Sequence, residues 1–169
     1  QAGERVLRGQ LVARKADGIS ANVYSPVAGT VKEIAGHITS SGKKQDHIHI
    51  VNDHTDESVG LPPLSERTPE SVLSRIEEAG IVGMGGAGFP TAVKLNVSGR
   101  VDVLVVNGAE CEPYITCDER IMLEYADELF AGIRLCMLAC GAKEAVIGIE
   151  KNKPEAIALL RQKAGEGVF

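Results

Sequence analysis

The chain has 169 residues, of which 44% are hydrophobic and 4% aromatic, and its formal net charge is −5 at pH 7. The length allows one or two domains, and the hydrophobic content is ordinary for a globular protein. The acidic balance argues against a general nucleic-acid surface, and the lack of Trp argues against a base-stacking platform. Because no apolar run approaches about 18 residues, we expect no membrane-spanning helix.

The N-terminal part of the chain, residues 1–60, is rich in glycine and in short β-like runs. Turns of Gly, Asp, Ser and Pro separate four such runs, which cover residues 10–13, 21–24, 29–34 and 45–51. This pattern is typical of a small all-β module. Residues 3–11 and 25–31 resemble the two halves of lipoyl- and biotinyl-type barrel-sandwich domains, in which a lysine at a hairpin tip is modified.

Lys15 falls near the position of that modified lysine, so a swinging-arm carrier is an alternative. The Met or acidic residues that flank the modified lysine in those hairpins are missing here. An exposed lysine in a turn also needs no special cause. An unmodified module is therefore the favoured interpretation.

Two histidines and four cysteines are candidate metal ligands. His47 and His49 alternate along a predicted strand and so share one face, but a metal site takes three or four ligands, and we expect no metal there. The cysteines lack the spacing of zinc or iron–sulfur motifs. Cys136 and Cys140 lie four residues apart on one helix face, which indicates core packing of reduced thiols.

Residues 61–67 form a proline-containing linker to a second part, residues 68–169, in which helices alternate with strands. Thr68 is expected to cap a helix over residues 71–79, which Gly80 ends. Strands are predicted over residues 101–107 and 144–150.

One long helix is predicted between these strands, from Asp118 as its cap to Gly141. Its apolar stripe consists of Ile121, Met122, Tyr125, Leu129, Ile133 and Cys136. Residues 152–155 are expected to cap a last helix. This order of elements implies an α/β domain with a parallel sheet.

A glycine-rich motif lies ahead of the first of these strands. Residues 83–94 read GMGGAGFPTAVK, with glycines at Gly83, Gly85, Gly86 and Gly88, followed by a probable helix start and Lys94. Glycine permits positive φ and close approach of a ligand, and helix-start N–H groups favour an anion. The motif therefore indicates a phosphate cradle, and a tight turn whose glycines serve only packing is the alternative.

A polar cluster follows the apolar run at residues 103–106, which is typical of a buried parallel strand. Asn107, Glu110 and Glu112 then stand beyond the carboxyl end of that strand, where open α/β sheets bind ligands. A flavin ring offers donors and acceptors that a carboxylate can pair. Solvated loop acids are the alternative.

These motifs together resemble the RnfC family of the Rnf electron transport complex, in their order and in the sequence NGAECEP at residues 107–113. The flavin- and NADH-binding subunit of respiratory NADH dehydrogenase is similar, less closely. The resemblance implies that FMN and NAD(H) are the cofactors of this domain.

The resemblance also implies residue roles in the glycine-rich motif. Gly83, Gly85 and Gly86 would lie along the flavin, and Lys94 would reach its phosphate or ribityl chain. Phe89 would stack near the nicotinamide cofactor.

In the acidic segment, the resemblance implies that Asn107, Glu110 and Glu112 line the flavin ring and the nicotinamide approach. Glu112, nearest the nicotinamide, is the candidate catalytic residue. Met84 and Ala109 replace the arginine and aspartate of the respiratory protein, and Cys111 replaces its serine. The Rnf proteins share these differences.

The implied function is electron transfer between a nicotinamide cofactor and iron–sulfur centres, by hydride transfer to FMN and then single-electron steps. The expected partners are the other subunits of the membrane complex, at the cytoplasmic face of the membrane. We expect the chain to be a fragment, with the ligands of the 4Fe-4S clusters elsewhere in the protein. The alternatives are a non-catalytic docking subunit with a relict flavin loop and a related flavin and iron–sulfur cobalamin reductase.

Overall fold

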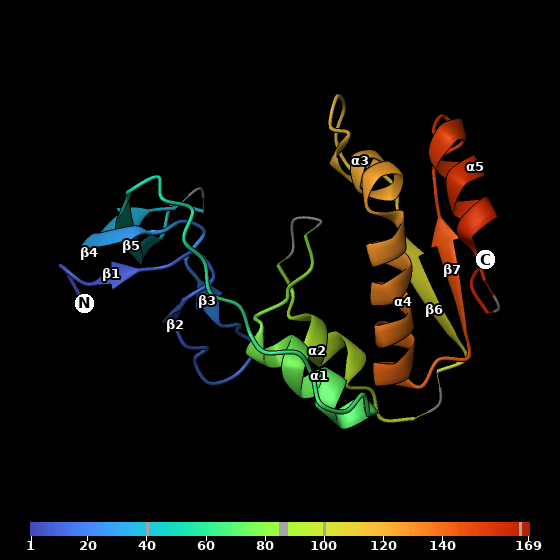
Figure 1. Cartoon of the computed structure of the whole chain (residues 1–169), viewed down its shortest axis with the longest axis horizontal. Coiled ribbons are helices and arrows are strands. Elements are labelled where there is room, and N and C mark those ends of the chain that lie inside the picture. Colours follow the sequence, from blue (N-terminus) through green and yellow to red (C-terminus); the bar gives the residue numbers. More distant parts are fainter. Residues whose placement is uncertain (40, 85–87, 100, 166) are drawn as a thin grey trace. The chain divides into compact units, whose positions relative to one another are not determined.

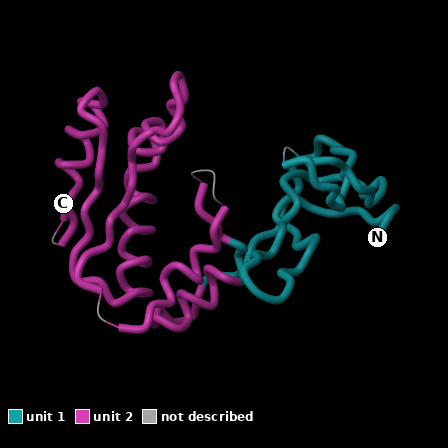
Figure 2. Tube along the Cα trace, turned by 180° about the vertical axis from the view of Figure 1, so that it is seen from behind, with its two compact units in different colours: residues 1–63, 78–80 teal, residues 64–77, 81–169 magenta. Residues whose placement is uncertain are grey.

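The computed structural model describes residues 1–39, 41–84, 88–99, 101–165 and 167–169. The chain divides into two compact units, residues 1–63 with 78–80 and residues 64–77 with 81–169 (Figure 2). The expected boundaries at residues 60 and 68 stay a prediction. Each unit is described by itself.

The first unit consists of antiparallel strands. They are β1 (Arg5–Val6), β2 (Leu11–Ala13), β3 (Val23–Tyr24), β4 (Gly29–Ile38) and β5 (Lys44–Asn52). One sheet has the order β1-β4-β5, and β2 pairs with β3 (Figure 1). The four β-like runs predicted from the sequence are therefore strands, and the strands that the structure describes form no closed barrel.

The longest pairing is the hairpin of β4 and β5, whose register runs from Gly29↔Asn52 to Ile38↔Lys44. An irregularity in this register lies between Val31 and Glu33. Val31 is buried on the inner side, together with Val6 and Ala28.

The second unit begins with α1 (Pro69–Glu78), and both of its predicted ends are confirmed. The Thr68 hydroxyl accepts from the N–H of Ser71 (3.2 Å), and the Ser71 hydroxyl accepts from the N–H of Thr68 (2.9 Å). Gly80 follows with φ 65°, and the N–H of Ile81 donates to the carbonyl of Ile76, as a Schellman end requires.

The sheet of this unit is the parallel pair β6 (Val103–Asn107) and β7 (Glu144–Gly148), with Val103 opposite Glu144 and Asn107 opposite Gly148. The other helices are α2 (Thr91–Leu95), α3 (Cys117–Glu124), α4 (Ala126–Cys140) and α5 (Pro154–Lys163). One face of the sheet packs against the core that contains Phe130, Ile133 and Leu160.

The expectation that residues 103–106 form a strand buried on both faces is wrong for the structure described. Exposed and half-buried residues alternate along β6, and Val105 is 73% exposed. The helices pack against Leu104 and Val106, which point to the opposite face.

The single helix expected from Asp118 to Gly141 is also wrong. Tyr125 has φ −125° and ψ 34°, outside the helical range, and it separates α3 from α4. The break rotates the apolar stripe, because Met122 and Ala126 are buried whereas Ile121 and Tyr125 are exposed.

Two predicted caps need correction as well. Thr116, not Asp118, is the N-cap residue of α3, and Asp118 lies in its first turn. The N-cap residue of α5 is Lys153, with Pro154 at the first helical position and no capping side chain. In the part of the chain described, no helix has the length and apolar character that crossing a membrane requires.

Candidate cofactor site at the carboxyl ends of the parallel strands

The carboxyl ends of β6 and β7 are joined by a tight turn. The N–H of Gly108 donates to the carbonyl of Gly148 (2.8 Å), and the side chain of Asn107 accepts from the N–H of Ala109 (3.1 Å). A Cβ at Gly108 would lie 3.1 Å from both the Gly148 carbonyl oxygen and the Met122 sulfur. Glycine at this position is therefore required by packing, and the Asn107 side chain is engaged in the turn.

Glu110 is the best-connected of the predicted site residues. Its carboxylate accepts from the N–H of Glu119 (3.0 Å) at the start of α3, and the Cys117 sulfur lies 3.9 Å from its other oxygen. Its N–H points to the carboxylate of Glu150, 3.4 Å away. Glu110 thus links the loop after β6 to α3 and to the loop after β7.

Lys153 lies among these carboxylates. Its ammonium donates to Glu119 at 2.7 Å, and the Lys153 side chain is only 12% exposed. The hydrogen bond with Glu119 raises the pKa of Lys153, against an opposing effect of desolvation, and the charges of Glu119, Glu110 and Glu150 raise it further. Glu119 and Lys153 were not predicted as site residues.

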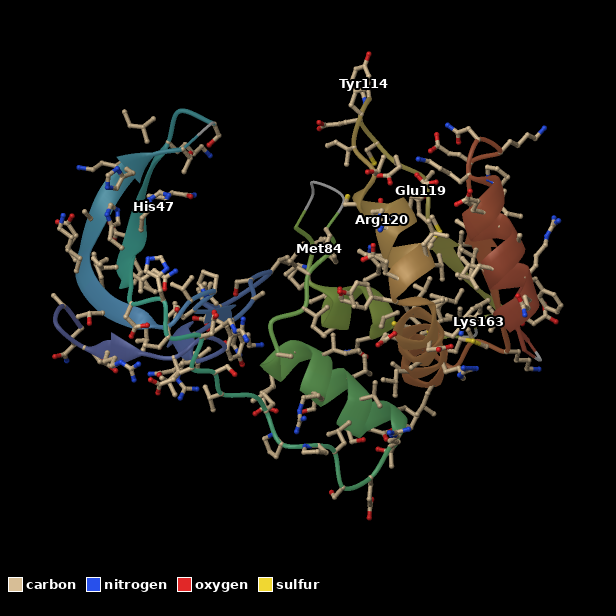
Figure 3. All side chains as sticks on the ribbon, turned by 45° about the horizontal axis from the view of Figure 1, so that its top comes forward. His47, Met84, Tyr114, Glu119, Arg120 and Lys163 are labelled. Atoms are coloured by element: carbon tan, nitrogen blue, oxygen red, sulfur yellow. The ribbon has the colours of Figure 1, made fainter. Side chains whose placement is uncertain are left out.

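A cavity of about 340 Å³ opens at this end of the sheet. Its lining consists of Glu110, Cys111, Glu112, Pro113, Tyr114, Ile115, Thr116, Glu150, Asn152 and Lys153. Glu112 is exposed, and no described side chain pairs with its carboxylate. Figure 3 shows Tyr114 at the tip of this loop, where it is fully exposed with φ 66°.

The glycine-rich motif forms a loop with paired arms. The N–H of Gly83 donates to the carbonyl of Phe89 (2.8 Å), and the N–H of Thr91 donates to the carbonyl of Ile81 (2.9 Å). Gly83 has no positive φ, and a Cβ there would meet only the Phe89 carbonyl oxygen, at 3.8 Å. The chain's own packing therefore does not require glycine at this position.

Two of the predicted flavin contacts, Gly85 and Gly86, lie outside the described residues. Phe89 is half-buried, and Lys94 lies exposed in the last turn of α2. Within the part of the chain that the structure describes, no carboxylate pairs with Lys94. In Figure 1 the arms of the loop extend toward the end of this unit at which β6 and β7 finish.

The structure thus brings Glu110 and Glu112 into one cavity, with Asn107 in the adjoining turn, and places Gly83, Phe89 and Lys94 on a separate segment. Glu150 was missed by sequence reasoning. A usable signal existed, because Glu150 follows β7 as Glu110 follows β6, and the ends of paired parallel strands meet at one edge.

A group of potential metal ligands also lies at this edge. Ligand atoms of Glu110, Cys117 and Asp118 are within 4.8 Å of one another. One oxygen of Glu110 already accepts from the backbone of α3, and Cys117 is exposed to solvent. We interpret these residues as part of the acidic rim of the cavity.

Comparison with known proteins gives two family matches that divide the chain. Residues 1–55 match the RnfC barrel sandwich hybrid domain, and residues 76–167 match the Nuo51 FMN-binding domain. The chain belongs to the RnfC family. The recognition made from the motifs at residues 83–94 and 107–113 is thereby confirmed.

Individual relatives agree with this assignment. The RnfC protein of the ion-translocating oxidoreductase complex of Haemophilus influenzae (strain PittEE) is 43% identical over 166 residues, which cover 94% of this chain and 25% of the relative. Its counterpart in Rhodobacter capsulatus is 44% identical over 160 residues, which cover 90% of this chain and 31% of the relative. The chain therefore spans about a quarter to a third of the length of these two relatives.

A solved structure is similar to part of the chain. The NAD+-reducing [NiFe]-hydrogenase in its H2-reduced state is 32% identical, with a TM-score of 0.52, over 56% of this chain and 17% of the hydrogenase chain. The RnfC-family chain thus shares both sequence and fold with a segment of a redox enzyme.

Proposed function

We propose that this RnfC-family chain contributes part of an FMN site to an electron-transfer subunit of an ion-translocating oxidoreductase. The observation that carries the proposal is the match of residues 76–167 to an FMN-binding domain together with the acidic cavity at the ends of β6 and β7. The name of the bacterial relatives and the similarity to an NAD+-reducing hydrogenase support the same redox class.

The described residues fit the chemistry of a flavin nucleotide. Gly83 leaves its surroundings open although the fold would accept a side chain there, and Lys94 offers an unpaired cation for a phosphate. Glu112 offers a free carboxylate at the cavity, able to accept hydrogen bonds from a ring N–H or to favour a cationic nicotinamide. When bound, FMN supplies the exchange between two-electron and one-electron transfer.

Each residue has a separate role in this proposal. The glycine loop, with Gly83, Gly85 and Gly86, lies along the flavin, and Lys94 holds its phosphate or ribityl chain. Glu110 positions the loop beside the ring through its bond to α3. Asn107 shapes the turn below the ring.

Phe89 and Glu112 complete the proposed site on the side of the nicotinamide dinucleotide. Phe89 stacks near that cofactor, and Glu112 orients the nicotinamide. Since Glu112 has no described partner, its charge is available to the substrate.

The further parts of the proposal concern the whole protein. Electrons pass from the nicotinamide cofactor to 4Fe-4S clusters whose ligands lie outside these 169 residues. The partners are the other subunits of the complex, and the protein lies peripherally at the cytoplasmic face of the membrane. The module at residues 1–55 carries no modified lysine.

Titration with FMN tests this function. The full-length protein that contains this sequence should bind FMN stoichiometrically, whereas the 169-residue chain should bind it weakly, because a partial pocket loses contacts that offset the cost of ordering. Flavin absorbance of the purified full-length protein also distinguishes the docking alternative. A full-length protein without flavin, and without affinity for added FMN, would refute the proposal.

A further inference from the structure

The β4–β5 hairpin gathers three histidines, where the sequence alone gave two. In the antiparallel register, Glu33 lies opposite His49, Ala35 opposite His47, and His37 opposite Gln45. Because side chains alternate along a strand, His37, His47, His49 and Glu33 project from one face of the hairpin. We call these four residues the histidine face. Figure 3 shows the hairpin as a curved ribbon that carries His47.

The rings of the histidine face are in contact. The centroids of His37 and His49 lie 4.6 Å apart in a stacked pair, and those of His37 and His47 lie 5.4 Å apart in an edge arrangement. Three imidazoles that bind one tetrahedral ion through nitrogens about 2.0–2.1 Å from it have ring centres roughly 5 Å apart. The backbone therefore already sets the ring spacing that a common ion needs.

The ring nitrogens do not yet converge within 4.8 Å of one another. His37 and His47 are exposed, and exposed side chains change rotamer in picoseconds to nanoseconds. Convergence thus takes ring rotation and no movement of the hairpin backbone.

Two of the histidines have the hydrogen-bond pattern of metal ligands. The Nδ1 atom of His47 lies 2.9 Å from the carbonyl oxygen of Gln45, and since a carbonyl only accepts, Nδ1 carries the proton and Nε2 keeps its lone pair. The Nδ1 atom of His49 lies 3.7 Å from a carboxylate oxygen of Glu33. Metal-binding histidines almost always direct their second nitrogen to a carbonyl or a carboxylate.

We propose that the histidine face is a binding site for a divalent transition-metal ion, with Zn²⁺ as the expected occupant. His37, His47 and His49 are its ligands, and a fourth position is left for water, as in three-ligand zinc sites. Glu33 orients His49 and raises its basicity. The site belongs to the first unit and does not depend on the proposed flavin site.

Calorimetric titration of the 169-residue chain with ZnCl₂, under reducing conditions, tests this proposal. Cys117→Ser is used as the background, because Glu110, Cys117 and Asp118 form a second group of potential ligands. One Zn²⁺ should bind per chain. His47→Gln should lower the affinity at least about tenfold, and Glu33→Gln about tenfold to a hundredfold, the range for orienting partners of ligands.

His54→Gln is the matched control. His54 follows β5 in a turn with φ 59° and lies outside the histidine face, so its replacement should leave zinc affinity unchanged. Circular dichroism in the presence of a chelator should show the same fold for all variants, since these side chains are not buried. Side-chain nitrogen NMR should show zinc-dependent shifts for His37, His47 and His49 and none for His54.

Three results would overturn the proposal. They are failure of the chain to bind Zn²⁺, equal zinc affinity in His47→Gln and in the background protein, and zinc-dependent NMR shifts confined to residues outside the histidine face.

Discussion

The carboxylate of Glu110 accepts a hydrogen bond from the N–H of Glu119, 3.0 Å away, and so closes the loop between β6 and α3. The first N–H groups of a helix have no partner within it, and Thr116, the N-cap residue of α3, makes no capping bond with its side chain. Glu110 takes that role from nine residues upstream. A residue that the family resemblance assigns to the flavin thus also supports a helix.

Removing this cap should destabilise the chain. Glu110→Ala should lower the free energy of unfolding by about 0.5–2 kcal/mol, the range for loss of a helix cap. Glu112→Gln is the control, since its exposed carboxylate has no described partner, and its effect should stay within about 0.5 kcal/mol. Urea denaturation of the 169-residue variants measures both. Equal stability of the two variants would show that the bond to Glu119 contributes nothing.

The same two positions should separate in redox behaviour when placed in the full-length protein. Glu112→Gln keeps size and hydrogen bonding but changes the charge that the dinucleotide meets, so reduction by NADH should slow while FMN is retained. Glu110→Ala should release FMN. Flavin content and stopped-flow reduction measure the two effects, at a temperature where both variants are folded. Identical behaviour of the variants would contradict the assigned roles, with Ala109 the first departure to examine.

Lys153 should give stability a dependence on alkaline pH. Its pKa is raised from 10.5, chiefly by the hydrogen bond with Glu119, so it binds its proton more tightly in the folded state. Its stabilising contribution is therefore complete below pH 10.5 and is lost as the pH rises through the folded-state pKa.

Lys153→Met tests this dependence. The stability difference between wild type and Lys153→Met should be constant near neutral pH and should shrink above pH 10.5. A double-mutant cycle with Glu119→Gln should give a coupling energy that disappears over the same pH range. A difference that persists undiminished at the highest pH where the fold survives would assign the effect to packing of the lysine stem.

Much of the fold was predictable because its signals are local. The Thr68 cap and the Gly80 end lie within one helical turn of the elements that they bound, and both are confirmed. The parallel pairing of β6 and β7 follows from the strand–helix–strand order. Packing of Cys136 and Cys140 against the core of Val72, Ile76, Leu95 and Ala139 was expected from their helical spacing.

What sequence reasoning missed depends on contacts between distant residues. The break at Tyr125 carries no Gly or Pro, and the apolar residues on either side of it fit one continuous helix as well as two. The capping of α3 by Glu110 joins two loops through space. His37 joins His47 and His49 only through the hairpin register, which residue spacing within one strand does not give.

The cysteines should differ in reactivity. Burial raises the pKa of the Cys136 thiol, and the neighbouring Cys140 raises it further, so Cys136 has less of the nucleophilic thiolate near neutral pH. Cys111 and Cys117 are exposed. Iodoacetamide should therefore modify Cys111 and Cys117 several-fold faster than Cys136 in the native chain, as followed by peptide mass spectrometry. Rates that are equal before and after denaturation would show that the helix α4 region opens freely.

Two glycines with different surroundings test what the glycine-rich loop is for. Gly80 has φ 65°, and a Cβ there would lie 2.3 Å from the Asn22 carbonyl oxygen, whereas Gly83 has neither a positive φ nor a close neighbour. Gly80→Ala should therefore destabilise the chain by about 1 kcal/mol or more, from backbone strain alone, and Gly83→Ala should leave its melting temperature nearly unchanged. In the full-length protein, Gly83→Ala should weaken FMN binding, because a methyl group would occupy the space for close approach of the flavin. Differential scanning calorimetry of the chain and flavin titration of the full-length protein measure the two effects. If Gly83→Ala lowers the melting temperature and leaves FMN affinity intact, the glycine serves the fold, and the loop is a structural turn.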